Sequence, residues 1–212
     1  MTGTAIGLRY WYQESFNVAH VFMTLFFSIN LVICYWECCL FLKADCVEQR
    51  AEYWSRRQQQ SGRRAAIGFL LDRVTISKIL SANVWADVWA TYSLFDKSYQ
   101  DRNTYGYIVD VGNGFITTLP TIFLYATFTL GFTPARIAGI VGVMLFWQLL
   151  YATAMYWVSF FISKRHRHLS RLEICIYIWG ANSPWIAGPL FGLYISTCLI
   201  LENNYRVLGL SI

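Results

Sequence analysis

Four long apolar segments constrain this chain more than any other feature of its sequence. They cover residues 19–42, 108–130, 137–162 and 174–200. Each reaches the roughly 20 apolar residues that a helix needs to cross the hydrocarbon core of a bilayer. Because lipid offers no partners to backbone amide and carbonyl groups, such segments satisfy those groups internally by forming helices. The sequence therefore predicts an all-α integral membrane protein.

Composition supports the same class of protein. Of the 212 residues, 56% are hydrophobic and only 14% are charged, whereas about a quarter of the residues in an ordinary soluble domain are charged. We expect a single membrane domain over residues 1–212. The first apolar segment lacks a basic start and is too long for a cleavable signal peptide, so we expect it to be retained.

The basic residues indicate how the chain is oriented. The net charge is +5, and the lysines and arginines cluster in two loops, residues 43–106 and 163–172. Cytosolic loops of membrane proteins carry an excess of these residues, so we expect both loops on the cytosolic side and no nucleic-acid partner. Residues 65–80 mix apolar and charged side chains as a surface-lying amphipathic helix does. A fifth transmembrane helix at that place is the alternative.

The second apolar segment has a polar side. If the segment is one helix, a single face carries Asp110, Asn113, Gly114, Thr117 and Thr121. An aspartate at the centre of a transmembrane helix costs about 2.5–3.5 kcal/mol unless it faces other helices or water. The sequence therefore predicts that this face points to the interior of the protein.

The other three segments show similar stripes at helical spacing: Asn30, Cys34, Glu37 and Cys38 on the first, Gln148, Tyr151, Met155 and Ser159 on the third, and Asn182, Trp185 and Pro189 on the last. Together they predict a bundle of four transmembrane helices, or five with the alternative above, around a polar-lined cavity. Two alternatives stay open. In the first, Glu37 is an interfacial carboxylate that is hydrated or pairs with Lys43. In the second, residues 84–99, which are rich in aromatic side chains, form an interfacial belt.

The sequence has no motif for a cofactor. It contains no phosphate-binding loop, no HExxH and no GxSxG. Five of the six cysteines lie within apolar segments, which favours packing thiols over disulfides or a metal site. We therefore expect no cofactor and no metal, so any chemistry has to move protons. The candidate catalytic acids are Asp110 and Glu37. The candidate substrate-binding residues are Asn30, Tyr92, Tyr99, Asn113, Thr117, Gln148, Tyr151, Asn182 and Trp185.

Four short motifs occur in order along the chain. They are NLVICYW at 30–36, the pattern W-x-x-Y-x-x-x-D-x-x-Y from Trp89 to Tyr99, WQLLYATAMYW at 147–157 and GANSPWIAGP at 180–189. Together they resemble the emopamil-binding-protein family, the membrane sterol Δ8-Δ7 isomerases that share the EXPERA domain. The resemblance implies that Asn182 and Trp185 line a sterol site.

The acid–base positions differ from the family pattern. Asp110 falls where the family has a catalytic glutamate, although a shifted alignment places Gly114 there. Asn30 and Cys34 stand where the family has histidine and glutamate, and Glu37, one turn beyond Cys34, is a candidate replacement for the lost acid.

The resemblance implies a function and a location. We expect a cofactor-independent isomerase or cyclase in the endoplasmic reticulum membrane that acts by proton transfer on a sterol, terpenoid or other apolar polycyclic substrate. Because the acid–base set is altered, the alternative is a non-catalytic sterol- or lipid-binding or trafficking protein that keeps the cavity. The expected partners are an apolar small molecule and membrane lipid, and a homodimer is left open.

Overall fold

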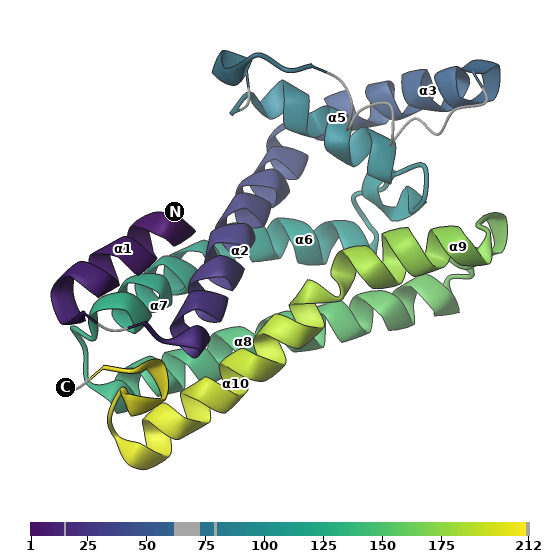
Figure 1. Cartoon of the computed structure of the whole chain (residues 1–212). Coiled ribbons are helices and arrows are strands. Elements are labelled where there is room, and N and C mark those ends of the chain that lie inside the picture. Colours follow the sequence, from purple (N-terminus) through teal and green to yellow (C-terminus); the bar gives the residue numbers. More distant parts are fainter. Residues whose placement is uncertain (15, 62–72, 79, 211–212) are drawn as a thin grey trace. The chain divides into compact units, whose positions relative to one another are not determined.

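A computed structural model describes the chain except for residues 15, 62–72, 79 and 211–212. Within the described part, the regular elements are helical (Figure 1). Three helices there are long and apolar enough to cross a membrane: Val18–Leu42 (α2), Ala135–Ile162 (α8) and Arg171–Glu202. A fourth span results if the bent pair Tyr105–Ile116 (α6) and Thr118–Leu130 (α7) crosses as one. These segments agree with the predicted spans and are consistent with a multi-pass membrane protein.

The other elements connect or continue these helices. Their bounds are Thr2–Gln13 (α1), Ala44–Ser61 (α3), Ile76–Lys78 (η1), Ala82–Tyr92 (α5), Lys97–Gln100 (η2), Arg165–His168 (η3), Arg171–Glu173 (α9), Ile174–Gly180 (η4), Pro184–Glu202 (α10) and Arg206–Leu208 (η5). The described part of residues 43–106, predicted as a loop with one amphipathic helix, therefore contains α3 and α5 as well as the short turns η1 and η2. The predicted amphipathic segment at 65–80 lies largely outside the described residues.

The chain forms two compact units. The first contains residues 1–34, 116–154 and 182–212, and the second contains residues 35–115 and 155–181. Helices α2 and α8 each contribute to both. The predicted site residues are divided between these two units as well.

The core of the first unit is built from phenylalanines on three helices. The ring of Phe27 on α2 lies 5.6 Å from that of Phe128 on α7 and stacks on Phe146 of α8 at 5.9 Å. Helix α10 approaches α8 closely because Gly192 has no side chain, since a Cβ atom there would lie 2.5 Å from the Phe146 ring. Small residues that let helices approach in this way are typical of membrane proteins. The first unit is therefore a helix-packed apolar core.

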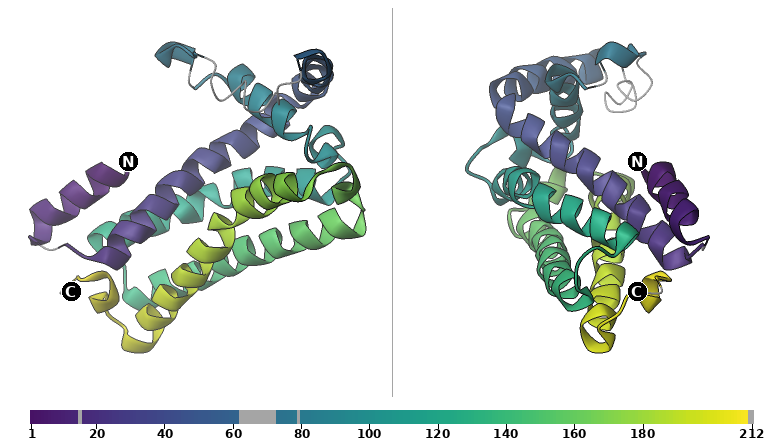
Figure 2. Two further views of the ribbon diagram at one scale, coloured as in Figure 1. Left: turned by 45° about the vertical axis from the view of Figure 1, so that its right-hand side comes forward. Right: turned by 90° about the vertical axis from the view of Figure 1, so that its left-hand side faces the viewer.

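Arg9 ties the N-terminal helix into the first unit. Its side chain is 2% exposed and donates to the carbonyl of Phe128 at 2.9 Å and to that of Leu208. The last carbonyls of a helix have no partner within it, so Arg9 satisfies the end of α7. After α10 the chain turns back into η5, which brings the carbonyl of Leu208 to the side chain of Arg9 (Figure 2). No sequence pattern around Arg9 predicts that this side chain is buried.

The core of the second unit includes the α3–α5 pair. Buried Ala44, Val47 and Ala51 recur along α3 at helical spacing, and with Trp54 they form one apolar face. That face packs with the buried residues Ala86, Trp89 and Ala90 of α5 in a single cluster. Helix α3 is otherwise polar, which explains why the stretch does not read as a transmembrane segment.

The second apolar segment is two helices rather than the predicted single one. Helix α6 ends at Ile116 and α7 begins at Thr118. Pro120 explains the break, because it has no amide hydrogen to donate to the carbonyl of Ile116 and its ring clashes with that carbonyl in a continuous helix. In the first turn of α7 the missing amide costs nothing. The predicted polar stripe is therefore divided, with Asp110 and Asn113 on α6 and Thr121 on α7.

The last apolar segment is also interrupted. Residues Ile174–Gly180 form the π-helix η4, and α10 starts at Pro184 in its first helical position. Proline is well suited to that position, because the amide it lacks has no partner in a helix's first turn. π-Helical turns are rare and occur frequently at functional sites.

Candidate functional site

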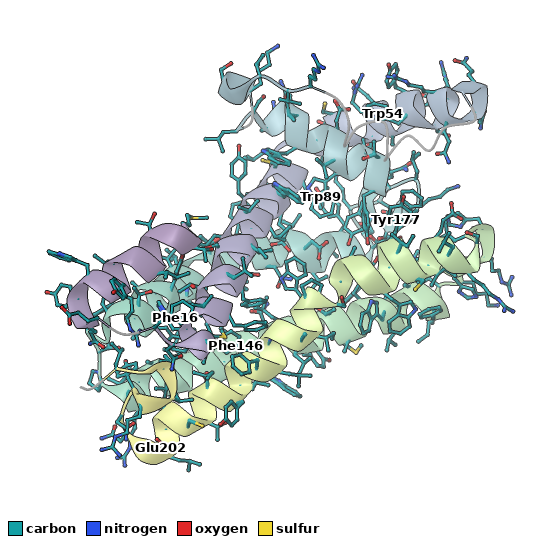
Figure 3. The ribbon with its side chains drawn as sticks, in the orientation of Figure 1. Phe16, Trp54, Trp89, Phe146, Tyr177 and Glu202 are labelled. Carbon is teal, nitrogen blue, oxygen red and sulfur yellow. The ribbon has the colours of Figure 1, made fainter. Side chains whose placement is uncertain are left out.

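The aromatic segment before α6 lies at the centre of the second unit. Trp89 on α5 and Tyr99 in η2 have ring centroids 4.9 Å apart, and the ring of Tyr92 lies 5.2 Å from that of Tyr99. Figure 3 labels Trp89 on α5 and Tyr177 on η4. Trp89 is 8% and Tyr99 is 3% exposed. The alternative that these two rings belong to an interfacial belt is therefore wrong, because protein surrounds them.

Asp96 is fully buried and held by three neighbours. Its carboxylate accepts two hydrogen bonds from Nη1 of Arg165, at 2.6 and 2.7 Å, and one from the hydroxyl of Tyr156 at 2.8 Å. The backbone amide of Ser98 donates to Oδ1 at 3.0 Å, which caps η2. A buried charge is stable only when it is paired and hydrogen-bonded. Asp96 is thus a fixed anchor of this part of the unit.

Tyrosines extend this network to the π-helix. The hydroxyl of Tyr92 donates to the carbonyl of Tyr177 at 3.0 Å and lies 3.4 Å from the hydroxyl of Tyr156. The hydrogen bonds therefore connect η4, α5 and the end of α8 to Asp96. Rings and hydroxyls held at both ends have little freedom to rearrange, so the cluster is preorganised.

Asp110 joins the cluster through Tyr99. Asp110 on α6 lies close enough to Tyr99 for its charge to act on the phenol. Gly106 permits this approach, because a Cβ atom there would lie 2.6 Å from Oγ of Ser98 in η2. Burial raises the pKa of Tyr99 well above its usual value, and the charge of Asp110 raises it further. The phenol therefore stays protonated. Asp110 itself is partly exposed.

The chemical capability of this arrangement is acid–base. A partly exposed carboxyl group beside a protonated phenol can donate or accept a proton. The neighbouring aromatic faces are negative at their centres and stabilise positive charge by cation–π attraction. We define Trp89, Tyr92, Tyr99, Tyr156 and Asp110 as the acid–aromatic cluster.

A second group of predicted residues meets in the first unit. Nε1 of Trp185 donates to Oδ1 of Asn30 at 2.9 Å, and Nδ2 of Asn30 donates to Oγ1 of Thr121 at 3.0 Å. One turn further along α2, Sγ of Cys34 lies 3.3 Å from Oγ1 of Thr117. Asn30, Thr117 and Thr121 are all buried. These polar groups satisfy one another inside the protein.

An apolar groove of about 320 Å³ lies in the same unit. Phe22, Phe26 and Ile29 of α2 line one side, and Pro184 and Gly188 of α10 line the other. Two of these residues, Ile29 and Pro184, are the chain neighbours of Asn30 and Trp185. The groove therefore borders the elements that carry the Asn30–Trp185 hydrogen bond.

The remaining predicted residues are distributed over both units. Glu37 on α2 and Asn113 on α6 are buried in the second, at 6% and 8% exposure. The alternative of a hydrated Glu37 is therefore wrong. Gln148 and Asn182 are partly exposed in the first unit.

Tyr151 does not line an interior. It is 53% exposed and stacks on Trp147, also exposed, at 6.2 Å. The buried face of α8 in the first unit is instead apolar and includes Leu145, Phe146 and Leu149. Tyr151 and Trp147 therefore lie on the outer face of α8, because apolar side chains occupy its inner face.

The partner of Asp96 is a functional residue that sequence reasoning does not find. The basic residues at 163–172 indicate only topology, yet Arg165 among them forms the buried ion pair. Asp96 itself indicates that such a partner exists, because a carboxylate within an aromatic segment next to a membrane needs a cation to pair with. Nothing in the spacing, however, distinguishes Arg165 from the neighbouring exposed Arg167.

The described residues place no group of three or more His, Cys, Asp or Glu side chains where they could hold a metal ion. Comparison with models of protein families, with curated proteins and with solved structures finds no match.

Proposed function

We propose that this chain is a divergent member of the emopamil-binding-protein family. In this proposal it is a cofactor-independent isomerase or cyclase of an internal membrane, the endoplasmic reticulum, and acts on a sterol, terpenoid or other apolar polycyclic substrate. The observation that carries the proposal is the position of Asp110 beside Tyr99, whose ring contacts those of Trp89 and Tyr92. It joins a proton-transferring group to rings that stabilise a cation.

The proposed reaction needs only proton transfer. The carboxylic acid of Asp110 protonates a carbon–carbon double bond of the substrate, which leaves a carbocation and an aspartate carboxylate. The Asp110 carboxylate then takes a proton from a neighbouring carbon, which forms the double bond at its new position and regenerates the acid. One proton is added and one is removed, so no oxidant, reductant or cofactor takes part. Tyr99 orients Asp110, while the faces of Trp89 and Tyr92 stabilise the cation.

The groove in the first unit supports an apolar ligand. Its walls are phenylalanine, leucine, isoleucine, alanine and proline side chains with little polar surface, and apolar walls with few polar groups are typical of small-molecule sites. The hydrogen bond between Trp185 and Asn30 joins the two helices that form the groove. We assign ligand recognition to the groove, with Trp185 and Asn30 holding its walls in place.

A binding protein is the second candidate. One observation favours it: the two positions where the family has acid–base residues are Asn30 and Cys34, and both bond to protein groups in the first unit. An amide and a thiol so engaged hold a ligand site in shape without transferring protons. In this case the chain is a sterol- or lipid-binding or trafficking protein.

Lipid extraction and mass spectrometry of the purified protein test the proposal. A co-purifying polycyclic molecule supports both candidates, and its conversion to an isomer during incubation supports the enzyme. Preparations that carry only bilayer phospholipids would contradict the enzyme.

A matched pair of tyrosine variants tests the role of Tyr99. Tyr99→Phe keeps the ring packing and removes the hydroxyl that, in this proposal, donates to the Asp110 carboxylate during the reaction. Hydrogen bonds to charged groups contribute about 1.5–3 kcal/mol, so we expect turnover to fall roughly 10- to 100-fold. Tyr12→Phe, at a phenol that is 71% exposed, is the control and should leave turnover unchanged. Equal turnover in both variants would show that Tyr99 does not orient the acid.

A further inference from the structure

The connection between α8 and α9 carries basic side chains that the proposed function does not use (Figure 1). Arg165 faces the protein interior, where its Nη1 lies 2.6 Å from a carboxylate oxygen of Asp96. Lys164, Arg167 and Arg171 are exposed instead. In the part of the chain that the structure describes, no carboxylate forms an ion pair with these three residues. We call them the basic turn.

Backbone hydrogen bonds hold the basic turn in place. The amide of Arg167 donates to the carbonyl of Lys164 at 3.2 Å, so these two residues lie at the two ends of one 3₁₀-type turn. Ser170 caps α9 and forms a capping box with Glu173, which fixes the first turn of the helix that starts at Arg171. Two hydrogen-bonded turns therefore present the three cations.

The outer side of this connection is positive after its internal pairing is counted. Arg165 and Asp96 neutralise each other. With the histidines counted as neutral, residues 163–173 otherwise contain the three cations of the basic turn and one acid, Glu173, so three minus one leaves a net charge of +2. The Glu173 carboxylate accepts hydrogen bonds from the amide and the hydroxyl of Ser170 at 2.8 and 2.7 Å, which engages it in the cap. An anionic partner is therefore favoured at this surface.

Exposed apolar side chains flank the basic turn. Ile162 ends α8 and is 74% exposed, and Leu172 follows Arg171 and is 60% exposed. Neither belongs to the apolar cores of the described residues. A soluble anion, an acidic protein or a nucleic acid would satisfy the charges and leave these side chains in water. At a membrane surface, by contrast, apolar groups enter the acyl region while lysine and arginine stay at the level of the headgroups.

We propose that the basic turn binds the headgroup of an anionic phospholipid, with Ile162 and Leu172 against its acyl chains. Guanidinium groups bind phosphate and carboxylate oxygens through paired N–H···O bonds, and lysine adds a point charge. The apolar helix α8 ends at Ile162, two residues before Lys164, so the cations follow the end of a candidate transmembrane helix directly. The predicted topology places this connection at the cytosolic leaflet, which carries the anionic lipids.

Native mass spectrometry of the purified full chain in neutral detergent tests this proposal. The probes are dioctanoyl phosphatidylserine, dioctanoyl phosphatidylcholine as the zwitterionic control, and phosphoserine as the headgroup without acyl chains. We expect saturable binding of phosphatidylserine, at least about fivefold tighter than that of phosphatidylcholine and at least about tenfold tighter than that of phosphoserine. Equal affinity for the two lipids would overturn the proposal. Phosphoserine that binds as tightly as phosphatidylserine would identify a soluble anion as the ligand and also overturn it.

Arginine variants of equal charge change separate the basic turn from general electrostatic attraction. Arg167→Gln and Arg171→Gln should each weaken phosphatidylserine binding about fivefold, the usual contribution of one basic residue near an anionic membrane surface. Arg167→Lys keeps the charge and should retain most of the affinity. Arg206→Gln is the matched control, because Arg206 is an exposed arginine of η5 in the first unit, and it should change the affinity less than twofold. Equal weakening by Arg167→Gln and Arg206→Gln would contradict a site at the basic turn.

Discussion

At the scale of single residues, buried charges determine how the second unit is held together. Asp96 has no exposed surface, and the side chain of Arg165 is 13% exposed. Removing one partner of such a pair leaves the other charged and unpaired in an apolar environment, which costs more than the pair contributes. Arg9 fills a comparable role in the first unit, where burial lowers its pKa to about 10, so it stays charged at neutral pH and holds the carbonyl groups it bonds.

The ion pair predicts a large stability effect at one arginine of the tract KRHRH, residues 164–168. Arg165→Met removes the cation and leaves the Asp96 carboxylate buried, so we expect the free energy of unfolding to fall by about 3–5 kcal/mol. Unfolding in detergent with increasing denaturant measures it. Arg167→Met removes an exposed arginine two residues away and should change stability by no more than about 0.5 kcal/mol. Equal losses in the two variants would mean that the ion pair does not stabilise this unit.

At the scale of helices, the apolar segments predict where the candidate transmembrane helices lie, but they do not predict where single residues interrupt these helices. The predicted segment 19–42 becomes α2 at Val18–Leu42, and 137–162 becomes α8 at Ala135–Ile162. Hydropathy is an average over many residues, so it does not detect Pro120 or the break that this residue causes. Hydropathy also does not detect α3, because this helix is mostly polar. Its narrow apolar face becomes evident only in its packing against α5.

The candidate site is predictable to a similar degree. Tyr92 and Tyr99 are predicted as substrate-binding residues, and the structure places their rings 5.2 Å apart. Helical spacing also predicts that Tyr151 faces inward, which is wrong, because amphipathic patterns cannot distinguish an inner polar stripe from an outer aromatic one. The Asp96–Arg165 pair joins residues 69 positions apart, and local sequence carries no information on such pairing.

The close approach of α8 and α10 predicts a steric effect at Gly192. Gly192→Ala places a methyl group 2.5 Å from the ring of Phe146, so we expect a loss of about 1–3 kcal/mol in unfolding free energy. Gly7→Ala is the control, since Gly7 lies on α1, where an added Cβ atom would meet no other atom within 4 Å. There the better helix propensity of alanine should stabilise the protein by about 0.5–1 kcal/mol. Unchanged stability in Gly192→Ala would mean that the helices are not packed this closely.

At the scale of the whole molecule, the predicted four-span topology places the two basic loops on the cytosolic side and the termini on the opposite side. Single cysteines at exposed positions test this in a background without other reactive thiols. Gln59→Cys and His168→Cys should both react with an impermeant reagent in sealed, cytosol-side-out vesicles. Thr4→Cys should react only after permeabilisation. Labelling of only one of the first two sites would contradict an even number of spans between the loops.

Proton transfer by Asp110 is the central claim, and isotope uptake tests it most directly. The purified enzyme with its co-purified polycyclic substrate is incubated in D₂O, and the product is examined by mass spectrometry. We expect a product that carries one non-exchangeable deuterium, formed at least about 100-fold more slowly by Asp110→Asn, in line with the usual contribution of a general acid–base group. Asp101→Asn, at an exposed aspartate outside the cluster, should match the wild type. Deuterated product from Asp110→Asn at the wild-type rate would contradict the account.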